Sequence, residues 1–391
     1  MIITNIAEIF GYDCVEPAWL RTEGETIAAM GPMSECPSDS EIIDARGGTA
    51  IPSFCDSHTH IVYAGSRHGE FLDKINGLTY EEIAARGGGI LNSADRLHET
   101  PEDELFRQSM ERADEVMRKG TGAIEIKSGY GLTLPDELKM LRVIARISEA
   151  SPMTVRATFL GAHAVGRAYV GRQGEYVRHI IDDMLPAVAA EGLADFVDVF
   201  CDRGFFTPQE TADILEASAR YGLRPKIHAD ELAASGGTYV GVSHHAVSVD
   251  HLEQAGDEEL ALLAGSDTIA TMLPGASFFL GMPYASARRA LSKGCRVALA
   301  SDYNPGSSPS GDMRFVWALG CIKMRLTPAQ ALTCCTETGA AAMDLARTHG
   351  RLAPGFRANI IISRLPLNAI PYRYNTPFID CHILNGRVIT E

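Results

Sequence analysis

Short apolar segments recur through the middle of the chain and alternate with longer segments of helical periodicity. The first, 50–57, is apolar and β-prone, with a glycine pair upstream and polar residues downstream, a pattern typical of a buried strand. Several intervening segments open with proline or an acidic residue and end near glycine, as helices do. The predicted strands are 50–57, 122–127, 154–160, 195–201, 225–229, 246–250, 268–273 and 296–301. The predicted helices include 101–119, 135–149, 208–221, 257–264 and 285–293.

These strands, each followed by a helix or a long loop, favour an α/β fold, a parallel (β/α)8 TIM-like barrel over residues 51–349. A doubly wound open sheet is the alternative, although no glycine-rich phosphate-binding motif follows the first strand. The two ends of the chain, 1–50 and 350–391, hold shorter β-like pieces separated by glycine, proline and aspartate. We expect these ends to form one composite β-sandwich domain.

Composition and charge narrow the classes of function. The chain has 391 residues, 46% of them hydrophobic, which is enough for a large core. A net charge of −15 argues against nucleic acid or an anionic membrane as a partner, since both need a basic face. No apolar run is long enough to span a membrane, and the N-terminus lacks the basic region of a secretion signal. Nine scattered cysteines without a C-x-x-C motif fit a reducing compartment, so we expect a cytoplasmic protein.

Histidine and aspartate close several predicted strands, where a barrel of this kind carries its catalytic groups. His58 and His60 follow the first strand, and residues two apart on a strand point to the same face. His228 closes the fifth strand and Asp302 the eighth. Such a mixed set suits zinc or iron, which lowers the pKa of a bound water from 15.7 to about 7. The alternatives are a packed strand-end histidine for His228 and a helix N-cap or Asx turn for Asp302.

A reaction that uses such a water also needs a group that moves protons. His251 and Glu231 are strand-end residues of suitable type. The alternatives are a cap of the next helix for Glu231 and a hydrogen bond to another side chain for His251. Arg67 carries the planar fork that recognises a carboxylate, although spacing alone favours a surface arginine. Tyr80 and Tyr130 are further candidates, and the glycines on both sides of Tyr130 allow the backbone to approach a ligand closely.

Characteristic blocks cover the whole predicted barrel in a fixed order: DSHTHIVYAGSRHGEF, ARGGGI, EIKSGYGL, TFLGAHA, KIHADEL, VDHLE, LPGASFFL and ASDYNPGSSP. The arrangement of histidine and aspartate in these blocks resembles the amidohydrolase superfamily. Within it, EIKSGYGL and TFLGAHA are similar to the imidazolonepropionase family in particular.

The resemblance implies hydrolysis of the ring amide of 4-imidazolone-5-propanoate to N-formimidoyl-L-glutamate, the third step of histidine degradation, with one Zn²⁺ or Fe³⁺ per chain. The implied metal ligands are His58, His60, His228 and Asp302. The implied substrate contacts are Arg67, Tyr80, Tyr130, His163, Glu231, Asn304, Gly306 and Ser307. The implied catalytic residues are His251, Glu231 and Asp302, with His251 and Glu231 as the proton relay.

Two departures from the family pattern carry expectations of their own. Val165-Gly-Arg follows the GAHA block where a proline and a glutamate are usual, so we expect a more mobile loop after His163. Segment 195–201 contains no lysine, which favours one metal over a lysine-bridged pair. A purine or pyrimidine aminohydrolase is the alternative enzyme, and a non-catalytic scaffold is disfavoured because every ligand is present. The sequence does not fix the oligomeric state, and a homodimer is favoured by base rate only.

Overall fold

The computed structural model describes residues 1–39, 41–78, 82 and 88–390, and its largest sheet has eight parallel strands in sequential order. The strands are β7 (Phe54–Asp56), β8 (Thr121–Lys127), β9 (Thr154–Ala162), β10 (Phe196–Cys201), β11 (Arg224–Ala229), β12 (Ser248–His251), β13 (Ile269–Met272) and β14 (Val297–Leu299). The ring closes just beyond β7 and β14, where Asp302 N donates to His58 O (3.0 Å) and His60 N to Tyr303 O (2.9 Å). The predicted parallel barrel is confirmed, and its closing seam carries three of the predicted metal ligands.

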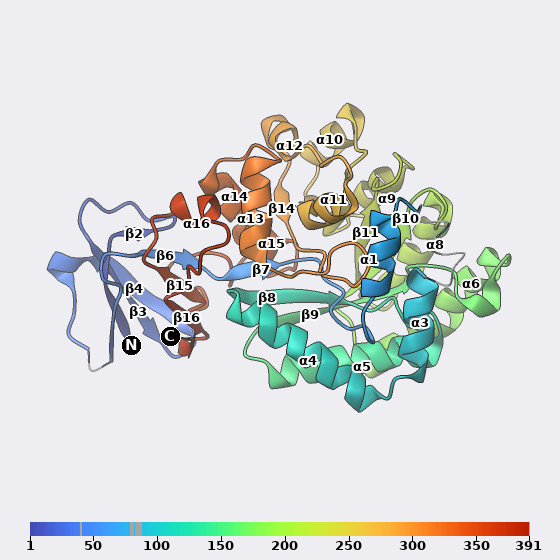
Figure 1. Cartoon of the computed structure of the whole chain (residues 1–391), viewed down its shortest axis with the longest axis horizontal. Coiled ribbons are helices and arrows are strands. Elements are labelled where there is room, and N and C mark those ends of the chain that lie inside the picture. Colours follow the sequence, from blue (N-terminus) through green and yellow to red (C-terminus); the bar gives the residue numbers. More distant parts are fainter. Residues whose placement is uncertain (40, 79–81, 83–87, 391) are drawn as a thin grey trace.

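Helices pack around the barrel and follow its strands along the chain (Figure 1). Thr207 and Glu210 form a capping box at the start of α8, and Thr327 and Gln330 form another at α14, which fixes where these helices begin. The helices around the barrel are α1 (His68–Ile75), α3 (Ile90–Glu99), α4 (Glu102–Arg118), α5 (Leu134–Ala150), α6 (Gln173–His179), α7 (Leu185–Glu191), α8 (Pro208–Ala219), α9 (Gly237–Ser243), α10 (Asp257–Ala264), α11 (Pro274–Leu280), α12 (Ala287–Lys293), α13 (Met313–Ile322), α14 (Pro328–Cys335) and α15 (Glu337–Ala341), and α16 (Ala369–Tyr372) follows later in the chain.

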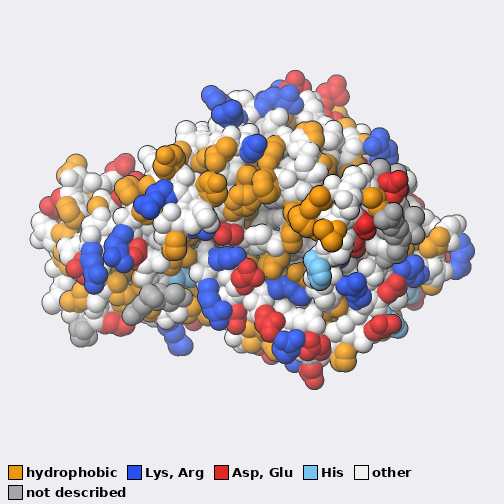
Figure 2. All heavy atoms as spheres, viewed as in Figure 1, with side chains coloured by type: hydrophobic (Ala, Val, Ile, Leu, Met, Phe, Trp, Pro, Cys, Tyr) orange, Lys and Arg blue, Asp and Glu red, His pale blue; other side chains and the backbone are white. Residues whose placement is uncertain are grey.

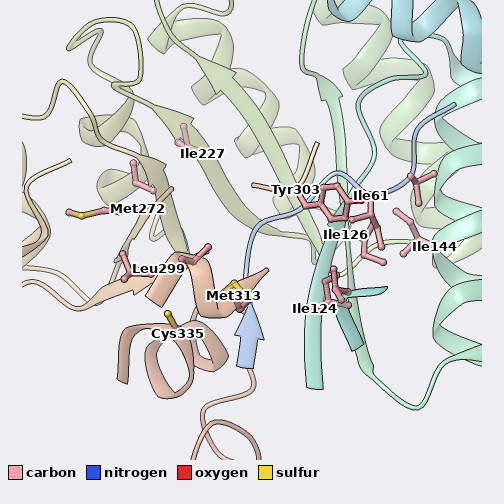
Figure 3. Packing of buried hydrophobic residues seen from close by; sticks show 14 of the residues in the cluster. Ile61, Ile124, Ile126, Ile144, Ile227, Met272, Leu299, Tyr303, Met313 and Cys335 are labelled. Carbon is pink, nitrogen blue, oxygen red and sulfur yellow. The ribbon is translucent and has the colours of Figure 1, made fainter. Parts of the chain in front are cut away.

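Barrel strands alternate between an outer apolar face and an inner face that is partly charged. Ile124 and Ile126 of β8 lie in the core cluster that includes Ile144 of α5 (Figure 3). Glu125 and Lys127, between and beyond them, face the opposite way and meet charged side chains of other strands inside the barrel. The outer layer therefore supplies the hydrophobic core, while the inner layer holds groups able to do chemistry.

The ends of the chain form two further sheets, one from the N-terminal end alone and one from both ends. The first has the order β4-β3-β1-β5 and the second β17-β16-β15-β6-β2. Buried side chains from both sheets, including Ile3, Leu20, Ile360 and Ile383, form one shared hydrophobic cluster. The division into domains at residues 50 and 350 stays a prediction. The strands are β1 (Ile2–Ile6), β2 (Glu8–Ile9), β3 (Ala18–Glu23), β4 (Thr26–Pro32), β5 (Ile42–Asp44), β6 (Thr49–Pro52), β15 (Ile360–Ser363), β16 (Cys381–Leu384) and β17 (Arg387–Thr390).

The single strand predicted over 50–57 is wrong, because this segment forms two strands in two different sheets. β6 pairs with β15 of the end sheet, whereas β7 pairs with β8 of the barrel. The change occurs at Ser53, whose N–H donates to Asn359 O (3.0 Å), while Phe54 N donates to Gly120 O (2.9 Å). Apolar character continues through the change of sheet, so hydrophobicity alone gave no sign of it.

The surface mixes basic and acidic side chains rather than separating them (Figure 2). Hydrophobic side chains gather on the face drawn there over α11 and α13. Among the residues that the structure describes, none of the helices combines the length and the apolar character needed to cross a membrane.

Candidate metal centre and active site

The structure brings the four predicted metal ligands together at the carboxyl ends of the barrel strands. His58 Nε2 lies 3.2 Å from His60 Nε2, and both nitrogens lie 3.6 Å from Asp302 Oδ1. The centroid of the His228 ring is 4.5 Å from that of His58 and 5.5 Å from that of His60. All four side chains are buried. We call His58, His60, His228 and Asp302 the ligand set.

Two carboxylates stand behind the imidazoles of His58 and His228. Asp250 Oδ2 lies 2.6 Å from His58 Nδ1, and Asp198 Oδ2 lies 2.9 Å from His228 Nδ1. The Asp250 carboxylate accepts, so His58 Nδ1 carries the proton and its Nε2 keeps a free lone pair. Asp198 stands at ion-pair distance from His228. Burial lowers the pKa of His58 and of His60 well below the ordinary value, which keeps both rings in the neutral form that binds metals.

The donor set fits a transition-metal ion. Two nitrogens each about 2.0–2.1 Å from zinc at a tetrahedral angle lie about 3.3 Å apart, close to the separation of the two Nε2 atoms. One ligand atom each from His58, His60 and Asp302 lie within 4.8 Å of one another, and the same holds for His58, His228 and His251. Imidazole with one carboxylate suits zinc and iron better than calcium or magnesium.

His251 reaches the site through an unusual backbone conformation. In a regular strand His251 would point away from its neighbour Asp250. Its φ of +87° breaks that alternation, and its ring centroid lies 5.3 Å from that of His228. Asp302 also has a positive φ, +52°. Left-handed conformations of residues other than glycine are uncommon and gather at functional sites.

Two glutamates flank His251. Its Nε2 lies 3.7 Å from Glu231 Oε2, and its Nδ1 lies 3.5 Å from Glu253 Oε2. Burial raises the pKa of Glu231 to about 7. Burial alone would lower the pKa of His251, but the two carboxylates outweigh it and raise this pKa to about 10. A proton therefore has neighbouring acceptors along the row Glu231, His251 and Glu253.

Two alternatives left open by the sequence are wrong. Glu231 does not cap the next helix, because α9 begins at Gly237; instead, Asp202 accepts the N–H of Glu231 (2.8 Å) and so fixes this loop. Asp302 is not a helix N-cap, because α13 begins at Met313 and is capped by Asp312.

Tyr130 and His163 stand beside the ligand set. The His163 ring stacks on that of His60, with centroids 5.4 Å apart, and the Tyr130 ring lies 5.3 Å from His163. His163 Nδ1 donates to Gly129 O (2.9 Å), which leaves its Nε2 as an acceptor. Burial lowers the pKa of His163 to about 3, so the ring is neutral. Beyond His163 the chain forms a short 3₁₀ turn (Arg167–Tyr169); the expected mobility of this loop stays a prediction.

Asn304, Gly306 and Ser307 form a compact loop next to Asp302. Asn304 Oδ1 accepts the N–H groups of Gly306 (2.7 Å) and Ser307 (2.8 Å), and its Nδ2 donates to Ser307 Oγ (2.7 Å). Ser307 Oγ in turn donates to Asp302 Oδ2 (3.2 Å). The three predicted substrate contacts therefore also hold a predicted ligand in place.

Arg67 lines a cavity of about 270 Å³ together with Gly306, Lys74 and the aromatic ring of Phe279. Its side chain is only 7% exposed, so the alternative of a surface arginine is wrong. Glu70 accepts from Arg67 Nε (2.9 Å) and Nη2 (2.6 Å), which holds the guanidinium in one plane. Tyr80 lies outside the residues that the structure describes.

Sequence reasoning missed the acidic residues behind the site, namely Asp198, Asp202, Asp250 and Glu253. A signal for two of them was present: Asp198 and Asp250 each stand inside an apolar strand, where an unpaired charge would be costly. A buried charge of that kind implies a partner, although the sequence does not say which one.

Comparisons with known proteins identify the family. The amidohydrolase family profile matches residues 49–389. An imidazolonepropionase from Flavobacterium johnsoniae is 48% identical over 99% of this chain and 96% of that protein, and one from Brevibacillus brevis is 43% identical over 90% and 83%. An atrazine chlorohydrolase from Arthrobacter aurescens, solved with zinc, shares the fold, with 15% identity, a TM-score of 0.75, and coverage of 100% of this chain and 95% of that one. The chain therefore belongs to the amidohydrolase family and, within it, to the imidazolonepropionases, hydrolases that act on carbon–nitrogen bonds.

Proposed function

We propose that this chain hydrolyses the ring amide of 4-imidazolone-5-propanoate to N-formimidoyl-L-glutamate, as the third step of histidine degradation in the cytoplasm. The observation that carries the proposal is the convergence of the ligand set beside the pair Glu231 and His251. Its relatives bear the name imidazolonepropionase over nearly the full length of the chain. The nine cysteines are scattered and form no C-x-x-C motif, in keeping with a reducing compartment.

One zinc or ferric ion per chain, held by the ligand set, is the proposed cofactor. When bound, such an ion would lower the pKa of a water so that it can lose a proton at neutral pH, and it would polarise the amide carbonyl. The neutral state of His58 and His60 and the orientation of His58 Nε2 support this assignment. Asp302 contributes the carboxylate ligand and lies against the same pair of imidazoles.

Glu231 and His251 are the proposed proton relay. Attack of water on the ring carbonyl forms a carbon–oxygen bond, the carbon–nitrogen bond then breaks, and the proton lost by water must reach the leaving nitrogen. Glu231 and His251 lie 3.7 Å apart at their facing atoms, their side chains are only 12% and 4% exposed, and both are types that exchange protons. Glu253 holds the far side of His251.

Arg67 is the proposed partner of the substrate's propionate. Its guanidinium lines the cavity beside Gly306, and Lys74 adds a second positive charge there. Tyr130, His163, Asn304, Gly306 and Ser307 would surround the ring, and Tyr80 belongs to the proposed set by family resemblance. A purine or pyrimidine aminohydrolase does not need a site for a carboxylate. A substitution of Arg67 therefore distinguishes that activity from the hydrolysis of imidazolone propanoate.

Replacement of Arg67 tests the proposal. Arg67→Ala should raise KM for imidazolone propanoate about 10- to 100-fold, the scale of a lost charged hydrogen bond, with kcat much less affected. Arg107→Ala is the matched control, since Arg107 lies exposed on α4 and pairs with Glu104 and Glu111. The assay follows formation of N-formimidoyl-L-glutamate by protein of measured metal content. An unchanged KM, or release of ammonia from a purine or pyrimidine in place of this reaction, would defeat the assignment.

A further inference from the structure

Five charged side chains are completely buried inside the barrel, earlier along the strands than the ligand set. Two carry positive charge and three carry negative charge, and none of the proposed chemical steps uses them. They come from β8, β10, β11 and β12, on the inward face of each strand. These residues are Glu125, Lys127, Asp198, Lys226 and Asp250.

Lys127 is the common neighbour of the two aspartates that orient ligand histidines. Its Nζ lies 2.8 Å from Asp198 Oδ2 and 3.6 Å from Asp250 Oδ2. These are the same oxygens that face His228 Nδ1 (2.9 Å) and His58 Nδ1 (2.6 Å). One ammonium group therefore stands behind two ligand imidazoles. One imidazole follows β7 and the other lies on β11, and these strands are not neighbours in the sheet.

Lys226 occupies a different place in the same cluster. Its Nζ donates to the carbonyl oxygens of Ser57 (2.9 Å) and Ala342 (3.3 Å) and to Glu125 Oε2, but stays 4.0 Å from Asp250. Glu125 Oε1 in turn accepts from Lys127 at 2.7 Å. Lys226 thus donates hydrogen bonds to the backbone and to Glu125, and its one contact with the two aspartates is the long ion pair to Asp250.

We infer that Lys127 is a positioning residue for the metal centre, which fixes the carboxylates of Asp198 and Asp250 and through them orients His228 and His58 together. The inference rests on the proposed function, because it takes these histidines as metal ligands. Burial alone would lower the pKa of Lys127, but the surrounding carboxylates raise it above the ordinary value, so the group is an ammonium. Without it, three buried carboxylates would face one lysine, and uncompensated buried charge is strongly unfavourable.

Zinc affinity of the purified, metal-stripped protein tests this role, measured by competition with a chelator of known affinity. Lys127→Met should weaken zinc binding about 10- to 100-fold, the usual effect of removing support behind a metal ligand. Lys226→Met is the matched control: it removes an equally buried lysine that shares Glu125, so it should lower the unfolding midpoint while weakening zinc binding less than about threefold. The absorption spectrum of the Co²⁺ form should change in the Lys127 variant only.

Two further variant sets keep the test decisive if Lys127→Met does not fold. Lys127→Met with Glu125→Gln removes one charge of each sign and should weaken zinc binding as strongly. Asp198→Asn and Asp250→Asn should each weaken zinc binding. The loss in the double variant should differ by at least about threefold from the product of the two single losses, because both carboxylates act through one ammonium. Equal losses from the two lysine variants, or strictly additive aspartate effects, would overturn the inference. A wild-type protein that binds no zinc or iron would instead overturn the proposed function.

Discussion

At the scale of single residues, the site is shaped by backbone conformation as well as by side chains. His251 and Asp302 both adopt positive φ, at a typical cost of about 1–3 kcal/mol each. Hydrogen bonds on either side hold these conformations: Leu252 N donates to Ala229 O (3.1 Å), and Asp302 N donates to His58 O (3.0 Å). The barrel thus imposes on His251 an orientation that a regular strand would not allow.

Removal of the His251 ring should reduce turnover without removing the metal. Because the proposed relay loses its middle member, His251→Ala should lower kcat by roughly 10²–10⁴, the usual scale for an acid–base group. Metal content and kcat are measured on the same preparation. His244→Ala is the control, since His244 lies at the end of α9 and bonds to Val240 O. Full turnover with metal bound would contradict the proposed role.

Residues that share a pattern along the chain could be predicted, while those that share only a place in space could not. His58 and His60 are two positions apart on one segment, so their common direction follows from strand geometry. Lys127 and Asp198 lie 2.8 Å apart but come from β8 and β10, and nothing local to either segment names the other. The ligand set was found because each member closes a strand, which is a local signal.

At the scale of elements, the loop after β8 depends on the first turn of α5. Glu137 on that helix accepts the N–H groups of Gly129 (3.1 Å), Gly131 (2.8 Å) and Leu132 (2.9 Å), and so sets the loop that carries Tyr130. A Cβ atom on Gly131 would collide with the backbone of Glu137. The close approach of helix and loop therefore requires glycine at this position.

Gly131→Ala should separate the loop from α5. We expect the free energy of unfolding to fall by about 1–3 kcal/mol, as for other overpacked sites, and KM to rise because Tyr130 moves. Urea unfolding and steady-state kinetics measure the two effects. Gly174→Ala is the matched control, because a Cβ there meets no atom within 4 Å on α6, and alanine favours a helix. Equal stability of the two variants would argue against this account of the loop.

Element positions in the barrel were predictable because each strand is a compact apolar run bounded by polar residues. The helix predicted over 257–264 has the bounds of α10, Asp257–Ala264. The segment 50–57 failed for a physical reason, since both of its halves are buried and only their hydrogen-bond partners differ. A change of sheet within a continuous apolar run leaves no trace in hydrophobicity.

At the scale of the whole molecule, two buried histidines connect distant parts of the chain. His382 Nε2 on β16 lies 3.0 Å from Ser53 Oγ, at the point where the chain passes from the end sheet to the barrel. His349 Nε2 lies 2.9 Å from Thr154 Oγ1 at the start of β9. Burial lowers the pKa of each ring to about 4, and for His349 the charges of Arg357 and Arg156 add to the effect.

These two histidines predict a loss of stability in mild acid. In the unfolded chain a histidine takes up a proton near pH 6.5, whereas in the fold each of these rings stays neutral until about pH 4. The unfolded state therefore binds more protons between these values, and stability falls as the pH is lowered from about 6.5 to about 4. A difference of about 2.5 pKa units corresponds to roughly 3 kcal/mol for each histidine.

Urea unfolding of the metal-loaded protein across that pH range measures the effect. His382→Gln and His349→Gln should each reduce the dependence of the unfolding free energy on pH by close to one proton, because glutamine keeps a polar side chain but does not titrate. His245→Gln, at an exposed side chain just beyond α9, should leave the dependence unchanged. Other buried groups titrate in the same range, so the difference between variant and wild type isolates each ring. A pH dependence that is identical in all four proteins would mean that neither buried ring resists protonation in the fold.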